Sequence, residues 1–158
     1  MQPSNFLDQM YDEIVTVLKG VMDPNNTSSP LFQNTDSTWN IYDGSQQDFT
    51  GTPAAVLIPS DGPKSVFQSN YMNKRGYGYY IFIVMDTELS GYATTRKNMR
   101  LITDGILDSL DRSNMLNNVI DILEASTFKW IEEEGAKGVQ IVAPLEVSAY
   151  KLVQTATS

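Results

Sequence analysis

The sequence predicts an α+β fold, in which a mostly antiparallel sheet carries a long hairpin arm and two main helices pack on one face. Apolar residues recur at spacings of three and four in residues 6–22 and 94–111, which is the helical period. Aromatic and β-branched residues crowd into residues 75–88, a run long enough for a central strand. The chain has 158 residues, a length that favours a single domain.

The N-terminal segment has the pattern of an amphipathic helix that packs on the chain's own sheet. Ser4 or Asn5 can cap its start, and Lys19 lies towards its end, where the helix dipole favours positive charge. Asp23 followed by Pro24 should end the helix. The apolar stripe comprises Phe6, Leu7, Met10, Tyr11, Ile14, Val15, Leu18, Val21 and Met22.

Residues 25–51 form a polar segment that also carries aromatic side chains. Plain linkers lack aromatic residues, so Trp39 and Tyr42 are expected to dock on a surface, either in the same domain or on a neighbour. Residues 39–42 are a candidate short strand.

Residues 52–59 predict a short strand with a proline near each end, followed by a turn at residues 60–63. Residues 60–75 then form the hairpin arm that leads into the central strand. Gly76 and Gly78 are expected to permit a bulge or bend where this arm meets the sheet. They do not form a phosphate-binding loop, because they enter a strand rather than a helix.

The second half of the chain starts with the predicted helix at residues 94–111, and residues 114–125 are either a short helix or a loop. Alternation predicts a strand at residues 127–133, and a turn follows. Residues 139–153 predict a long strand in which Pro144 indicates an edge position or a bulge. Residues 154–158 are expected to be a flexible C-terminus.

Composition excludes several classes of function. The chain has neither histidine nor cysteine, which excludes serine triads, cysteine nucleophiles, disulfides and zinc–thiolate sites. Its net charge of -8 argues against tight binding to DNA, which needs clustered Lys and Arg. The N-terminus lacks a basic leader followed by an apolar segment, so neither secretion nor membrane anchoring is expected.

Carboxylates are the remaining candidates for chemistry. Asp86 and Glu88, with the run at residues 132–134, could supply oxygen ligands to magnesium. Neighbouring side chains on a strand point to opposite faces, so the three consecutive glutamates cannot converge on one ion. A solvated charge run explains them better, and we expect no enzymatic activity, no metal and no cofactor.

The order of elements resembles the tail terminator and tail completion proteins of long-tailed bacteriophages. The resemblance covers residues 5–153. It rests on the helix at the N-terminus, the Pro-Ala-Ala-Val strand at residues 53–56, the Tyr-Gly-Tyr-Tyr-Ile-Phe-Ile-Val strand at residues 77–84, and the helix at residues 96–110. Two closing strands complete this layout. The polar loop at residues 25–51 is longer than the layout predicts.

This resemblance implies a structural virion protein of the head–tail joining region, assembled in the host cytoplasm. Its subunits would form a ring, typically a homohexamer, that caps the tail tube and meets the neck or head-completion protein. Partners would therefore be copies of the chain, the tail tube protein and the neck protein, with DNA only in transit and no membrane. Acidic subunits suit a channel through which DNA slides.

A head-to-tail ring needs two different surfaces on each subunit. The candidate surfaces are the arm at residues 60–75 and the loop around Trp39. The candidate interface residues are Trp39, Tyr42, Phe67, Tyr71, Met72, Lys74 and Arg75. The alternatives are another viral neck, head-closure or tail tube protein, and a non-viral adaptor or ligand-binding domain.

Overall fold

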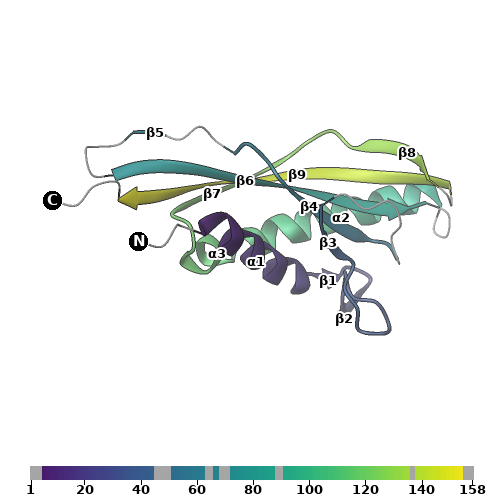
Figure 1. Ribbon diagram of the computed structural model, residues 1–158. Helices are drawn as coiled ribbons and strands as arrows, with labels where there is room; N and C mark the ends of the chain where they lie inside the picture. Colours follow the sequence, from purple (N-terminus) through teal and green to yellow (C-terminus); the bar gives the residue numbers. More distant parts are fainter. Residues whose placement is uncertain are drawn as a thin grey trace.

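The computed structural model describes residues 5–44, 51–62, 66–67, 72–87, 91–135 and 138–154; for residues 66, 67, 72, 135, 138 and 154 it describes the backbone alone. Its helices are α1 (Phe6–Lys19), α2 (Tyr92–Asp111) and α3 (Asn114–Asn118). Its strands are β1 (Met22–Asp23), β2 (Asn26–Pro30), β3 (Ile41–Asp43), β4 (Ala54–Pro59), β5 (Val66–Phe67), β6 (Met72–Asp86), β7 (Ile122–Thr127), β8 (Ile131–Gly135) and β9 (Gly138–Gln154). The helices lie together on one face of the main sheet, which confirms the predicted α+β fold (Figure 1).

The main sheet is organised around β6 and β9, which are antiparallel neighbours from Met72 opposite Gln154 to Asp86 opposite Gln140. The strand order is β3-β4-β6-β9-β7; β5 also pairs with β6, and β8 also pairs with β9. Among the described strands of this sheet, β3 and β4 are the only parallel pair. The run of aromatic and β-branched residues is therefore a central strand, as predicted.

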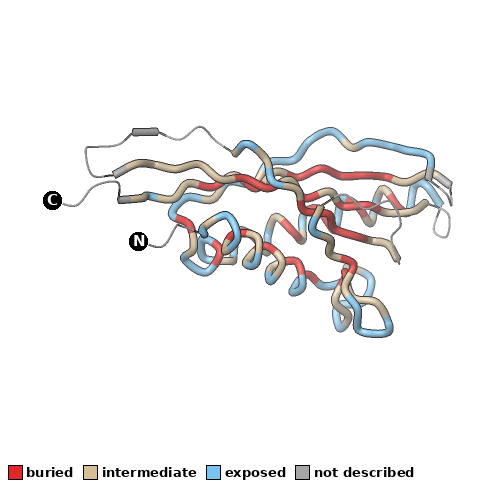
Figure 2. Tube along the Cα trace, viewed as in Figure 1, coloured by how far each residue is buried: buried red, intermediate tan, exposed pale blue. Residues whose placement is uncertain are grey.

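The hydrophobic core lies between the helices and the sheet, where Figure 2 shows buried segments on both layers. Alternate residues of β6, namely Tyr79, Ile81 and Ile83, contribute one side of it. The helices contribute residues at spacings of three and four, including Met10, Ile14, Leu18, Met99, Ile102, Ile106 and Leu110. One face of each helix and one face of the sheet thus pack together into a single core.

Helix α1 ends at Lys19, earlier than predicted, and Gly20 is its C-cap. Val21 is buried beyond the helix end and Met22 begins the β1–β2 hairpin, so these two residues do not continue the stripe. The hairpin stops the helix because Met22 must be extended to pair with Pro30. Asn5 is the N-cap residue, but its side chain makes no capping hydrogen bond.

The polar segment contains more structure than predicted, since it supplies β2 and β3 and an isolated bridge between Gln33 and Trp39. Phe32 is fully buried and Trp39 packs against the core. The short strand expected at residues 39–42 is β3 at Ile41–Asp43. Residues 45–50 lie outside the described part of the chain, and so does most of the expected flexible C-terminus.

Pro144 lies in a central strand, so the predicted edge position is wrong. Its carbonyl accepts a hydrogen bond from the Phe128 N–H at 3.1 Å. In an antiparallel strand the N–H and C=O of one residue face the same neighbour, so the missing N–H of Pro144 faces the break between β7 and β8. There residues 128–130 lie opposite residues 143–144, which is a bulge in the neighbouring chain segment.

The segment between α2 and β8 follows the prediction of a short helix or a loop only at residues 114–118, because residues 122–125 belong to strand β7. Residues 114–118 form a left-handed turn with φ between +51° and +65°, and the buried Leu116 anchors it. Three of these five residues are asparagine, the non-glycine residue that tolerates this conformation best. The strand predicted at residues 127–133 is instead the end of β7, a connection and the start of β8.

Gly78 marks a close crossing of two chain segments. Of the predicted bulge or bend, the bulge is absent, because β6 keeps its register with β9 through Gly76 and Gly78. A Cβ atom at Gly78 would lie 2.8 Å from the Gly62 Cα atom. One at Gly62, whose φ is +66°, would lie 2.6 Å from the Tyr77 carbonyl carbon. The Ser60 N–H donates to the Gly78 carbonyl at 3.0 Å. Both glycines are needed because the two backbones touch.

We predict that Gly78→Ala lowers the free energy of unfolding by about 1–3 kcal/mol, because the added methyl group must displace backbone. Urea unfolding measures this. Gly20→Ala is the matched control, since a Cβ there meets the Val17 carbonyl oxygen at an ordinary 3.5 Å. Equal free energies of unfolding for the two variants would contradict the close backbone contact between Gly62 and Gly78.

Tyr79 links the sheet to α1. Its hydroxyl donates to the Leu7 carbonyl at 3.0 Å, and its ring lies 5.9 Å from that of Tyr11. Burial, followed by the negative charge of Asp43, raises the pKa of Tyr79 to about 12 and also raises the pKa of Tyr11. The folded protein therefore keeps Tyr79 protonated above the pH at which an unfolded chain loses this proton.

The expected consequence is a loss of stability as the pH rises from about 10, where an unfolded tyrosine ionises, to about 12, the folded pKa of Tyr79. Tyr79→Phe should flatten this decline and cost about 1 kcal/mol at neutral pH through the lost hydrogen bond. Urea unfolding across this pH range measures both effects. Tyr80→Phe is the control, because Tyr80 is the next residue and lies on the opposite face of the sheet; this variant should lose stability with pH as the wild-type chain does. Identical plots of unfolding free energy against pH for the two variants would refute the assignment of this loss to Tyr79.

Candidate subunit interface

The face of the sheet that points away from the helices carries a second set of apolar side chains. Ile81 and Ile83 belong to the helix-side core, so the alternate residues Tyr80, Phe82 and Val84 point to the open side. We call the following set the open-face cluster. It consists of Val56, Ile58, Tyr80, Phe82, Val84, Phe128, Ile131, Val142 and Pro144.

Strand register arranges most of this cluster in rows across the sheet. In one row, Val84 lies opposite Ala54 on β4 and opposite Val142 on β9, and Ile131 of β8 follows Val142. A second row joins Val56, Phe82 and Pro144. The rows bring apolar side chains from four strands together on this face of the sheet, where Val56, Val84, Val142 and Pro144 are buried.

Aromatic contacts tie the rows together. The ring of Tyr80 lies 5.8 Å from that of Phe82 and 6.2 Å from that of Phe128. Phe128 and Ile131 remain 46% and 45% exposed at the β7–β8 edge. Among the described residues, none of the helices lies on this side of the sheet (Figure 1). Phe128 and Ile131 are therefore the large apolar groups that the open-face cluster exposes, while Tyr80 and Phe82 are half-buried.

Trp39 and Tyr42, two of the predicted interface residues, line an open hollow of about 670 Å³ beside β3. Trp39 docks within its own domain, against the core, and Lys19 Nζ lies 5.3 Å from the centroid of its ring. The Tyr42 hydroxyl donates to the Asn40 side-chain oxygen at 3.2 Å. The sequence left open whether Trp39 docks in the same domain or on a neighbour. In the structure it packs against the core of its own chain, and it also borders the hollow.

Polar groups shape the rest of this hollow. The side-chain amides of Asn34 and Asn40 bond to each other at 2.8 and 3.0 Å, and so hold the loop closed. The Thr38 hydroxyl and N–H both donate to Asp36 and lower the pKa of this carboxyl. Polar side chains that are hydrogen-bonded to one another therefore line the hollow around the edge of the Trp39 ring.

Lys74 and Arg75, also predicted interface residues, belong to β6 rather than to a projecting arm. They point to opposite faces of the strand. Lys74 Nζ lies 4.0 Å from the centroid of the Tyr150 ring, and Arg75 Nη1 lies 3.5 Å from the Tyr77 hydroxyl. They do not act as one basic pair.

The remaining predicted residues are only partly described. Phe67 lies in the two-residue strand β5 and Met72 begins β6, so this part of the arm is a hairpin on the sheet. Their side chains lie outside the described structure, as does the whole of Tyr71. Their assignment to an interface stays a prediction.

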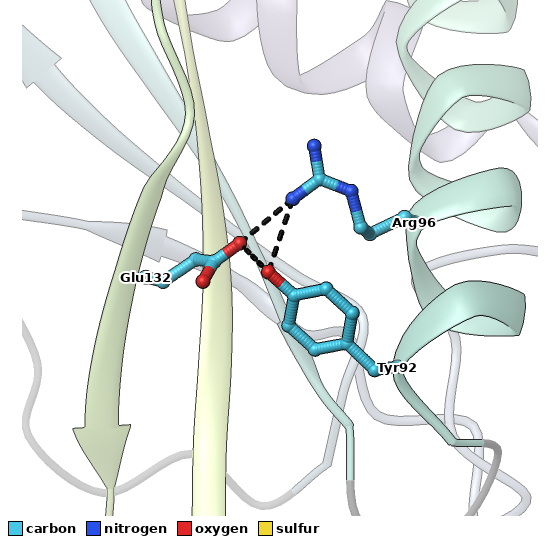
Figure 3. A network of polar contacts seen from close by, with 3 residues as sticks. All are labelled: Tyr92, Arg96 and Glu132. Atoms are coloured by element: carbon cyan, nitrogen blue, oxygen red, sulfur yellow. Dashed lines mark hydrogen bonds and ion pairs between the residues drawn. The ribbon is translucent and has the colours of Figure 1, made fainter.

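A polar network that the sequence did not suggest holds β8 against α2 (Figure 3). Arg96 Nη1 lies 2.7 Å from Glu132 Oε1, and the Tyr92 hydroxyl donates to the same oxygen. The Arg96 guanidinium also lies 5.3 Å from the centroid of the Trp130 ring. These contacts fix the edge that carries Phe128 and Ile131.

Glu132 was expected to be part of a solvated charge run, and this expectation is only partly correct. It points to the helix side because it lies opposite the buried Ile141, whereas Glu133 lies opposite Gln140 and points the other way. Alternation predicted the split between neighbouring carboxylates, but no sequence spacing links Glu132 to Arg96. Among the described residues, no group of three or more acidic side chains is placed to hold a metal ion.

The geometry defines a small α+β fold in which helices cover one face of the sheet and the other face exposes Phe128 and Ile131 at its β7–β8 edge. In the part of the chain that the structure describes, no helix is long and apolar enough to cross a lipid bilayer. Neither a protein-family profile nor a curated protein sequence matches this chain.

Proposed function

We propose that the chain is a structural virion protein, the ring-forming tail terminator or tail completion subunit of a long-tailed bacteriophage. A ring of copies, six in the typical arrangement, caps the tail tube and joins it to the neck of the head. DNA passes through the ring without being held. This proposal extends the resemblance in element order with the features of the molecular surface.

The open-face cluster is the observation that carries the proposal. Side chains such as Phe128 and Ile131 are large, apolar and nearly half exposed, and they continue inward to the buried Val84 and Val142. A contiguous apolar patch with a polar rim is typical of a surface that binds another protein. Burial of such side chains in a contact removes apolar area from water, which favours assembly.

The position of this patch favours a ring over a closed pair. The β7–β8 edge, with Phe128 and Ile131, and the β3 edge, beside Trp39 and Tyr42, are opposite edges of one sheet. A contact between two different surfaces of the same subunit repeats from copy to copy and closes when the rotation permits. The two edges supply the two surfaces that a head-to-tail ring requires.

Charge supports transit of DNA rather than its capture. The net charge of -8 repels phosphates, because the 19 Asp and Glu residues outnumber the 11 Lys and Arg residues. Binding to the DNA backbone depends on cations that are free to replace counterions. An acidic ring therefore lets DNA slide.

Native mass spectrometry of the purified chain tests the proposal. We expect a closed ring of defined mass, which the double variant Phe128→Ser with Ile131→Ser reduces to smaller species, because the change removes the exposed apolar edge of the open-face cluster. Leu7→Ser is the matched control, since Leu7 is 38% exposed on α1, on the other side of the sheet. Circular dichroism verifies that each variant is folded.

The possible results separate the function from the surface. A wild-type chain that stays monomeric over the accessible concentrations refutes the ring. A ring that survives in the folded double variant refutes the assignment of the open-face cluster as its interface. Electron micrographs with long stacks of rings would instead identify a tail tube protein.

A further inference from the structure

The solvent-facing side of α2 is divided into a basic and an acidic half. Lys97 and Arg100 lie in the N-terminal half, and Asp104 and Asp108 lie in the C-terminal half. All four are exposed, and helical geometry places them on one stripe because they are three or four residues apart. We call these four residues, with Leu101, the α2 stripe.

Local stability explains little of this order of charges, although Arg112, the C-cap residue, follows Asp108 at the favourable spacing of four. Acidic groups are favoured near the start of a helix and basic groups near its end, yet the first turn of α2 has no acidic residue and the last turn has no basic one. Asp104 and Asp108 repel each other at a spacing of four, and Arg100 precedes Asp104 in the less favourable order. Within the described structure, no oppositely charged group lies within 4.0 Å of these four side chains.

The α2 stripe is complementary to itself when a second copy runs in the opposite direction. The two-fold axis that brings Lys97 opposite Asp108 of the second copy also brings Arg100 opposite Asp104, because both pairs are centred close to residue 102. Leu101 lies beside that centre and is 43% exposed. Its two copies would meet at the axis, with ion pairs on either side.

We propose that α2 packs antiparallel against α2 of a second copy of this chain, about a two-fold axis beside Leu101. The contact goes beyond the proposed ring and does not rest on it. The helix α2 lies on one face of the sheet (Figure 1), and most of the open-face cluster points to the other face, but Phe128 borders a hollow of about 350 Å³ together with Arg100 and Asp104. The two proposed contacts therefore adjoin at this edge of the molecule. The α2 contact doubles the mass of whichever assembly is present, whether a monomer or a ring.

A single helix pair is a small interface, and its charges are exposed, so we expect a reversible contact that weakens with salt. Sedimentation velocity compares about 10 mM salt, where the Debye length is about 30 Å, with about 1 M salt, where it is about 3 Å. The wild-type chain should show a twofold larger mass at the lower salt concentration. Ring formation through apolar surface should not show this loss at high salt.

Charge reversal is the sharper test at low salt. Lys97→Glu with Arg100→Glu gives an all-acidic stripe, and Asp104→Lys with Asp108→Lys gives an all-basic stripe. Each double variant should have half the wild-type mass, and an equimolar mixture of the two should recover it, because the stripes are now complementary only between variants. All four positions are exposed, and circular dichroism verifies folding.

Cross-linking provides an independent measurement. The chain has no native cysteine, so Leu101→Cys introduces a single thiol. A short bismaleimide should join Cys-bearing copies into covalent dimers at low salt, since a residue beside a two-fold axis meets its own counterpart. Thr94→Cys is the control, because it is exposed on the same helix but about two turns away from the axis.

The proposal is overturned if either charge variant keeps the wild-type mass, or if the mixture of folded variants does not regain it. Equal cross-linking through positions 94 and 101 also overturns it. A wild-type ring that persists with half the mass in both charge variants supports the α2 contact and the ring together. A change from dimer to monomer supports the α2 contact alone.

Discussion

Pairing of β6 with β9 is the constraint on which the rest of the structure depends. Every other strand of the main sheet attaches to one of these two, directly or through β4. Their unbroken register from Met72 opposite Gln154 to Asp86 opposite Gln140 fixes which side chains face the helices. A slip of one residue would exchange the faces. It would place Tyr80 and Phe82 in the core and Ile81 outside it.

Local rules predicted the elements well where one pattern dominated. The period of α1, the aromatic run of β6 and the apolar spacing of α2 each require a particular secondary structure whatever their neighbours are. Pro144 shows where such rules end. The sequence indicates that one ladder hydrogen bond is missing, but the break that accommodates it belongs to residues 128–130, on the next segment. Only the tertiary arrangement brings the two together.

The residues of the candidate site also fall into those that the sequence predicted and those that only the tertiary arrangement reveals. Exposure of aromatic groups in polar segments singled out Trp39 and Tyr42, which do line one hollow. The open-face cluster was missed because the run at residues 77–84 is apolar on both faces and reveals no side for the helices. The ion pair of Arg96 with Glu132 joins residues 36 apart in the chain. Its partners have ordinary sequence surroundings, so no local signal identifies them.

The two proposed contact surfaces differ in chemistry, since one is apolar and the other is charged. This difference determines how strongly each contact would depend on salt. Apolar groups such as Phe128 gain stability only by leaving water, and this gain does not fall with ionic strength. The charges on α2, such as Lys97 and Asp108, are already well solvated and gain little from pairing unless salt is low. Of the two proposed contacts, the one through the open-face cluster would therefore be the more durable, and the one through α2 would be reversible. An assembly built in this way closes its apolar interfaces first and joins finished units afterwards.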